Sequence, residues 1–154
     1  MSTIISPITT FSCLKISGSQ AKDFLQGQLT CDVNTLTNNN ILLSAYCNER
    51  GRITATGYLM QIEDTYCFFT PKNLIAHTEQ KFRQYGIFSN IQITQDDTFS
   101  MLACIGALPR FNLPTQALER TTITENVYGT CLNANTDLYC IFGEKLALAA
   151  IQDN

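Results

Sequence analysis

Two short polar stretches of this sequence hold side chains suited to binding a small ligand. We call them the first polar corner (residues 26–32) and the second polar corner (residues 46–52), and each contains a glycine. Their candidate residues are Gln26, Gln28, Thr30 and Asp32 in the first and Asn48, Arg50 and Arg52 in the second. Amide, hydroxyl and carboxylate groups can hydrogen-bond to a heterocycle, and guanidinium groups can pair with carboxylates. The same residue types also cap helices and close turns, so a binding role and a purely structural role are both open.

The rest of the sequence contains no recognisable catalytic or metal-binding motif. Its seven cysteines are odd in number and include no CxxC pair, which favours buried, reduced thiols over disulfides, zinc sites or iron–sulfur clusters. The single histidine, His77, has no acidic or cysteine partner at ligand spacing, so we expect it at the surface. The acidic pairs at 63–64 and 96–97 fall in predicted turns, where carboxylates are solvated. We therefore predict no catalytic residue and no metal site.

The composition is typical of a folded, soluble protein. The chain has 154 residues, of which 45% are hydrophobic and 15% charged, and its net charge is −3. A protein that binds nucleic acid mainly through its phosphates usually carries the opposite charge balance, so direct nucleic-acid binding is disfavoured. No apolar run approaches the roughly 18–20 residues of a membrane span, and the N-terminus lacks the pattern of a signal peptide. We expect a cytoplasmic protein without membrane contact.

Periodicity and turn residues predict an α+β fold with a mostly antiparallel sheet and a few packed helices. Strands are expected at 11–17, 41–47, 52–62, 65–70, 90–95, 98–105, 121–126 and 137–142. Helices are expected at 20–26, with Ser19 as its N-cap and Gly27 just past its end, at 71–85, with Thr70 as its N-cap, and at 144–152. Gly57, inside the long predicted strand, indicates a close approach of another backbone segment.

Three segments stand out by their order and spacing: LKISGSQAKDFLQGQLTCDVNTL (14–36), LLSAYCNERGRI (42–53) and KFRQYGIFSNIQI (81–93). Together they resemble the YgfZ-type folate-binding proteins, which are relatives of the glycine-cleavage T-protein, an aminomethyltransferase. The order and spacing match the N-terminal part of the family from about residue 11 to 106. The resemblance implies that residues 1–40 form the strand–helix segment of a first folate-binding domain and that 41–154 form an α+β sheet domain.

The resemblance also implies a function: a folate-binding accessory protein linked to iron–sulfur cluster maintenance and, through it, to tRNA modification. The implied ligand is tetrahydrofolate or a derivative, and iron–sulfur proteins are the implied partners. Both polar corners would then face a folate cavity. In the family an aromatic residue before the first strand contacts folate, and Phe11 takes that position here. Plain core packing explains Phe11 equally well.

Two departures from the family pattern bear on activity. The T-protein enzymes carry an acidic pair after the hairpin glycine, where this chain has Thr54-Ala55-Thr56. The family's Lys-Gly-Cys-aromatic-x-Gly-Gln-Glu segment has no counterpart, because none of the seven cysteines follows Lys-Gly. The chain is therefore expected to be an N-terminal fragment or a shortened form.

Two other functions stay open from the sequence. One is an aminomethyltransferase-like, tetrahydrofolate-dependent one-carbon transferase, which needs a carboxylate supplied from elsewhere. The other is a non-enzymatic interaction domain that forms a homodimer through an exposed strand edge. The resemblance favours folate binding without catalysis over both.

Overall fold

The computed structural model of the protein describes residues 3–106 and 108–152. The chain forms two compact units: the central unit (residues 10–97) and the terminal unit, made of the residues before 10 and after 97. These boundaries differ from the division at residue 40 that the sequence suggested. Strand pairing is the reason, because the strand after residue 10 pairs with strands that end at 71 and 96, which places 1–40 in both units.

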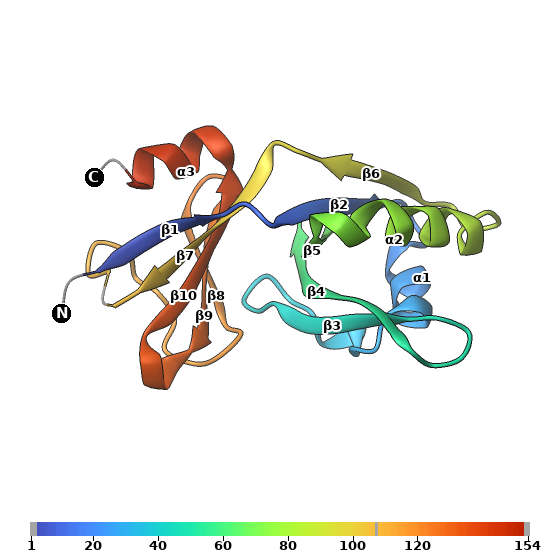
Figure 1. The fold of residues 1–154 in the computed structure, drawn as a ribbon, viewed down its shortest axis with the longest axis horizontal. Coiled ribbons are helices and arrows are strands. Elements are labelled where there is room, and N and C mark those ends of the chain that lie inside the picture. Colours follow the sequence, from blue (N-terminus) through green and yellow to red (C-terminus); the bar gives the residue numbers. More distant parts are fainter. Residues whose placement is uncertain (1–2, 107, 153–154) are drawn as a thin grey trace. The chain divides into compact units, whose positions relative to one another are not determined.

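The central unit is a five-stranded antiparallel sheet with two helices on one face (Figure 1). Its sheet order is β3-β4-β5-β2-β6, so β4 is an interior strand, as its apolar residues on both faces predicted. The elements are β2 (Phe11–Ser17), α1 (Ala21–Gln28), the 3-10 turn η1 (Val33–Thr35), β3 (Leu42–Cys47), β4 (Ile53–Ile62), β5 (Thr65–Pro71), α2 (Lys72–Tyr85) and β6 (Gln92–Asp96).

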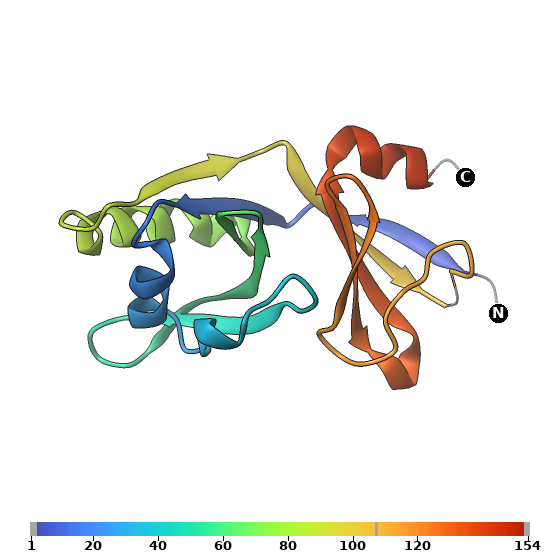
Figure 2. The same cartoon turned by 180° about the vertical axis from the view of Figure 1, so that it is seen from behind.

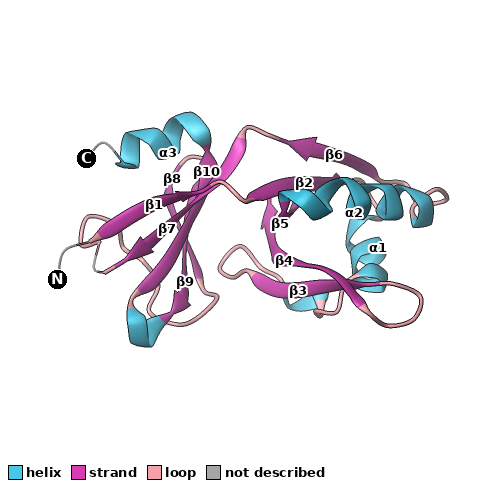
Figure 3. Ribbon diagram, in the orientation of Figure 1, coloured by secondary structure: helices cyan, strands magenta, loops and turns pink. Residues whose placement is uncertain are grey.

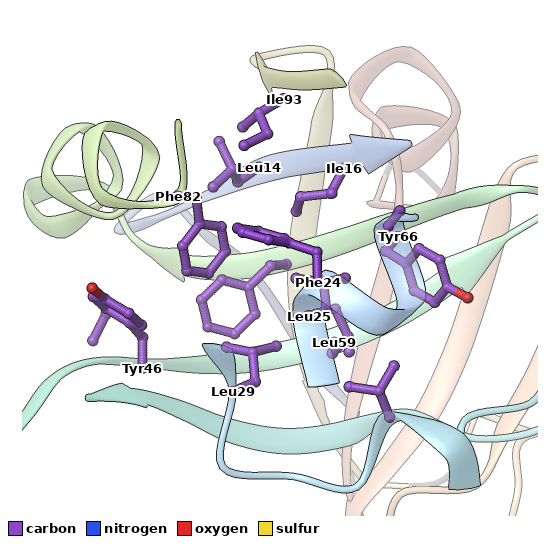
Figure 4. Packing of buried hydrophobic residues seen from close by; sticks show 14 of the residues in the cluster. Leu14, Ile16, Phe24, Leu25, Leu29, Tyr46, Leu59, Tyr66, Phe82 and Ile93 are labelled. Carbon is purple, nitrogen blue, oxygen red and sulfur yellow. The ribbon is translucent and has the colours of Figure 1, made fainter. Parts of the chain in front are cut away.

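Phe82 of α2 is the centre of this unit's core (Figure 4). Its ring packs edge-on against Phe24 of α1, with the ring centres 5.6 Å apart, and against Tyr46 of β3, at 5.4 Å. It stacks on Phe68 of β5 at 6.5 Å. Edge-to-face aromatic pairs add to the free energy gained by burying apolar area. One side chain therefore fixes both helices to the sheet.

The helix ends differ from the predicted caps. Gly27 lies inside α1, and the chain leaves the helix in extended conformation at Leu29. Ser19 does not cap α1, because its Oγ accepts a hydrogen bond from Asn90 Nδ2 at 2.9 Å. Thr70 does not cap α2, because its hydroxyl donates to the Thr56 carbonyl at 2.9 Å and Pro71 occupies the cap position. In both cases a residue distant in sequence competes successfully for the hydroxyl.

Gly57 makes the close approach that the sequence predicted. A Cβ at this position would lie 2.1 Å from the Phe69 carbonyl oxygen, so no other residue fits without a shift of the backbone. This contact brings β4 and β5 together beside the buried Phe68 ring.

The terminal unit is a second five-stranded antiparallel sheet, in the order β1-β7-β10-β9-β8. Figure 2 shows its strands from behind, and Figure 3 shows α3 following the last strand. The elements are β1 (Ile4–Ile8), β7 (Phe99–Ile105), β8 (Arg120–Thr124), β9 (Val127–Asn133), the 3-10 turn η2 (Ala134–Thr136), β10 (Leu138–Glu144) and α3 (Lys145–Gln152).

Two strands of this unit, β1 and β9, were not predicted from the sequence. Pro7 weakens the strand signal of β1, and proline is tolerated there because β1 is an edge strand. Gly129 interrupts the pattern of β9 in the same way. The α+β fold class with its largely antiparallel sheets is nevertheless confirmed (Figure 3).

Candidate functional site

The first polar corner pairs with the edge strand β3. Leu29 forms a β-bridge with Tyr46, and the Thr30 amide donates to the Ala45 carbonyl at 2.9 Å. The Ala45 amide donates in return to Thr30 Oγ1, also at 2.9 Å. The Cys31 amide extends the pairing by donating to Ser44 Oγ at 3.3 Å. The end of α1 is therefore held against the strand that leads into the second corner.

Two more side chains of the first corner stabilise the turn that follows α1. Gln26 Oε1 accepts a hydrogen bond from the Val33 amide at 2.6 Å. Asp32 Oδ1 accepts from the Asn34 amide at 3.1 Å and caps η1, as its residue type predicted. Gln28 is half-buried, and its side chain hydrogen-bonds to no described residue. Of the four candidates in this corner, only Gln28 thus keeps its whole side-chain amide available to a ligand.

In the second polar corner Asn48 organises the hairpin tip. Its Oδ1 accepts hydrogen bonds from the amides of Arg50 and Arg52, both at 3.0 Å. Its own amide donates to the Arg52 carbonyl at 2.9 Å, and Gly51 supplies the positive φ of +72° that the tip requires. Arg50 and Arg52 are exposed, and within the described residues neither forms a salt bridge. Two cationic groups are therefore presented on a rigid turn.

Phe11 lies in the same cross-strand row as the first polar corner. It pairs with Pro71 on β5, the register of β4 and β5 (Tyr58 opposite Phe69) continues to place Thr56 opposite Pro71, and Thr56 pairs with Ala45 on β3. Directly paired residues of antiparallel strands share one face of a sheet. Three strand spacings separate Phe11 from Ala45, or roughly 15 Å. An elongated ligand could therefore contact both the half-buried Phe11 ring and the corner beside Ala45.

Glu49 at the hairpin tip is bonded to the end of α2. The Tyr85 hydroxyl donates to its carboxylate, and Lys81 Nζ lies 3.8 Å from it. The hydrogen bond from Tyr85 lowers the pKa of Glu49, with Lys81 contributing, and the bond to Glu49 raises the pKa of Tyr85 to about 12. No local pattern in the sequence predicts this contact, because the two residues lie 36 positions apart.

The corners offer hydrogen bonds, an aromatic face and positive charge, but the neighbouring strand offers no acid. Thr54 and Thr56 occupy the stretch of β4 after the hairpin, and Thr54 Oγ1 donates to the Tyr46 carbonyl at 3.2 Å. Among the described residues no group of three His, Cys, Asp or Glu side chains is arranged to hold a metal ion. These groups are of the types that bind and orient a small polar ligand.

The single histidine, His77, is exposed on α2, as its position in the sequence suggested. Across residues 3–106 and 108–152, none of the helices combines the length and apolar character needed to cross a bilayer. The edge of β3, one candidate for pairing with a second chain, is occupied near Ala45 by the first polar corner.

The fold closely matches a solved enzyme structure. Glycine cleavage system aminomethyltransferase T from Bartonella henselae superposes with a TM-score of 0.81, covering 98% of this chain and 44% of that chain at 16% identity. At this identity the likeness shows the fold, and the T-protein-like α+β fold is confirmed.

Sequence comparison identifies the relatives. The tRNA-modifying protein YgfZ of Colwellia psychrerythraea is 27% identical over 104 residues, 68% of this chain. This chain is thus similar to a partial stretch of YgfZ proteins over more than half of its own length. Two further relatives show similar identity. The tRNA-modifying protein YgfZ of Vibrio atlanticus is 30% identical over 92 residues, 60% of this chain. That of Hamiltonella defensa is 28% identical over 120 residues, 78% of this chain. The expected resemblance to YgfZ is thereby confirmed.

The matches cover only part of each YgfZ relative. The chain spans 32%, 28% and 36% of these three relatives, so about a third of their length. No protein-family model matches the chain.

The pairing of Thr30 with Ala45 predicts a measurable loss of stability when the side-chain acceptor is removed. Thr30→Val keeps the side-chain shape but leaves the Ala45 amide without its partner, and should lower the free energy of unfolding by about 1 kcal/mol. Thr30→Ser keeps the hydroxyl and serves as the matched control. Urea unfolding measures both, and equal stability of the two variants would contradict the structural role.

The bond between Tyr85 and Glu49 predicts a window of pH in which the hairpin tip is held. The raised pKa of Tyr85 stabilises the fold at pH values below its ordinary pKa of about 10, and this contribution disappears as the pH rises towards 12. The lowered pKa of Glu49 stabilises the fold above its ordinary pKa of about 4.3, and that contribution is lost as the pH falls.

NMR of ring-labelled tyrosine can follow this titration residue by residue. Tyr85 should titrate near pH 12 in the parent protein and closer to about 10 in Glu49→Gln, because the carboxylate charge is gone. The same midpoint in both proteins would show that Glu49 is not the cause of the shift.

Proposed function

We propose that this chain is the part of a folate-binding accessory protein that carries one side of the folate site. The observation that supports this most is the homology to YgfZ, in a fold that brings both polar corners onto one strand, β3. The T-protein-like fold is consistent with a folate-related role. The proposed ligand is tetrahydrofolate or a derivative of it.

Each part of a folate molecule has a suitable counterpart in the central unit. The half-buried ring of Phe11 offers a stacking face for the flat pterin or aminobenzoate ring. Gln28 has both an amide donor and an acceptor available for polar groups on the ligand. Arg50 and Arg52 suit the carboxylates of the glutamate tail, because neither forms a salt bridge with a described residue.

The other candidates act indirectly in this proposal. The side-chain oxygens of Gln26, Thr30, Asp32 and Asn48 hold backbone amides, and so they fix the positions of the groups that bind. Both interpretations from the sequence then apply to the same corner. Its turns are structural, and the surface that they present binds the ligand.

The proposed protein binds folate without catalysing transfer of a one-carbon group. Thr54 and Thr56 occupy the stretch where the T-protein enzymes carry acids, so a general acid or base is missing there. We place its role in the cytoplasm, in tRNA modification supported through iron–sulfur proteins, with folate rather than RNA as the direct ligand. The net charge of −3 is consistent with a direct ligand other than RNA.

The test is a calorimetric titration of 5-formyltetrahydrofolate into the 154-residue chain and its variants. Phe11→Ala should weaken binding about tenfold, because an aromatic stacking contact is lost. Arg50→Gln and Arg52→Gln should each weaken it severalfold, and more at low salt, because exposed charges are screened by ions.

Two matched controls separate binding from folding. Phe88→Ala removes an aromatic side chain that is 96% exposed, and Lys72→Gln removes a positive charge outside the corners. Neither should change the affinity. Saturable binding that is insensitive to Phe11→Ala and to both arginine variants would contradict the proposed placement of the folate.

A further inference from the structure

A separate cavity of about 500 Å³ opens in the central unit where β2 meets α1 and β4 turns into β5. It shares no residue with either polar corner or with Phe11. Three hydroxyl residues, two oppositely charged residues and one buried tyrosine carry its chemistry: Ser17, Ser19, Thr65, Lys22, Asp64 and Tyr66.

Tyr66 is the residue that marks this cavity as more than a surface depression. It is only 7% exposed, yet its hydroxyl makes no hydrogen bond with any described residue. Figure 4 shows its oxygen pointing away from the Phe82 cluster, and Tyr66 lines the cavity. Among the described residues no buried side-chain nitrogen or oxygen lacks a hydrogen-bond partner, so the Tyr66 oxygen is accessible from the cavity and can bond to a ligand there.

Lys22 and Asp64 line the same cavity without pairing with each other. Neither forms a salt bridge with a described residue, although their charges are opposite. The space around them therefore has a positive and a negative group, each available to a bound molecule. A ligand with one charge of either sign would meet one favourable and one unfavourable group.

The start of α1 adds to the positive side. Its N-cap, Gln20, makes no side-chain hydrogen bond to the helix, and the first turn carries Lys22 together with Asp23, whose charge acts on Tyr66. Backbone amides of a first helical turn attract negative groups. Ser19 lines the cavity beside them.

The negative side lies at Tyr66. Burial raises the pKa of its hydroxyl, and the charges of Asp64 and Asp23 raise it further. The hydroxyl is therefore neutral at physiological pH and lies in a negative local potential, which favours a cationic group on the ligand.

We propose that this cavity binds a small zwitterion of the α-amino-acid class. The carboxylate of the ligand contacts Lys22 and the first turn of α1, and its ammonium group contacts Asp64 and the Tyr66 hydroxyl. The three hydroxyl residues favour a polar side chain on the ligand. This site is independent of the proposed folate site, since the two have no residue in common.

NMR titration of the full chain with single L-amino acids that have uncharged side chains tests the proposal. At least one should bind saturably, with a dissociation constant below about 10 mM. Butyrate carries only the carboxylate and n-butylamine only the ammonium, and each should bind at least about tenfold more weakly.

Variants place the bound amino acid within the cavity. Lys22→Gln, Asp64→Asn and Tyr66→Phe should each weaken binding about fivefold or more, because each removes one charged or hydrogen-bonding partner. Lys72→Gln removes a lysine outside the cavity and should leave binding unchanged. Saturable binding of no amino acid, equal binding of butyrate, or insensitivity to all three cavity variants would each overturn the proposal.

Discussion

The pairing of the first polar corner with β3 is the interaction on which the rest of the candidate site depends. The reciprocal bonds between Thr30 and Ala45 fix where α1 ends and cover part of an edge strand. They also bring two stretches that lie about fifteen residues apart in sequence onto one strand. Without this pairing the two corners would be separate loops that share no strand.

The aromatic core makes that pairing rigid. Phe82 contacts Tyr46 on β3, the strand that pairs with the first polar corner. It also contacts Phe24 on α1, the helix that leads into this corner. The hydrogen bond between Tyr85 and Glu49 then joins the hairpin tip to the end of α2, the helix that carries Phe82. Most corner side chains are consequently used for support, and the groups left for a ligand are Phe11, Gln28 and two arginines. The backbone of both corners is held in this way, so binding there would cost little backbone conformational entropy.

The sequence predicted the features that depend on near neighbours and missed those that depend on distant ones. Periodicity and turn residues predicted the hairpin of β3 and β4 and the helix α2. The glycine inside β4 predicted the close backbone approach at Gly57. Ser19 and Thr70 were assigned as caps, but Asn90 and Thr56 hold their hydroxyls instead. The row that contains Phe11 depends on strand register across four strands, and the unpartnered Tyr66 hydroxyl depends on packing. Neither leaves a local pattern that residue types alone could reveal.

The central claim is that folate binds along the row from Phe11 to the two corners. Backbone NMR of the isotope-labelled chain, titrated with 5-formyltetrahydrofolate, tests it most directly because every amide reports separately. The account predicts the largest shifts at Phe11, around Thr30 and Ala45, and at the hairpin tip between Asn48 and Arg52. Saturable shifts that leave these amides unmoved, and concentrate instead in the terminal unit, would contradict it.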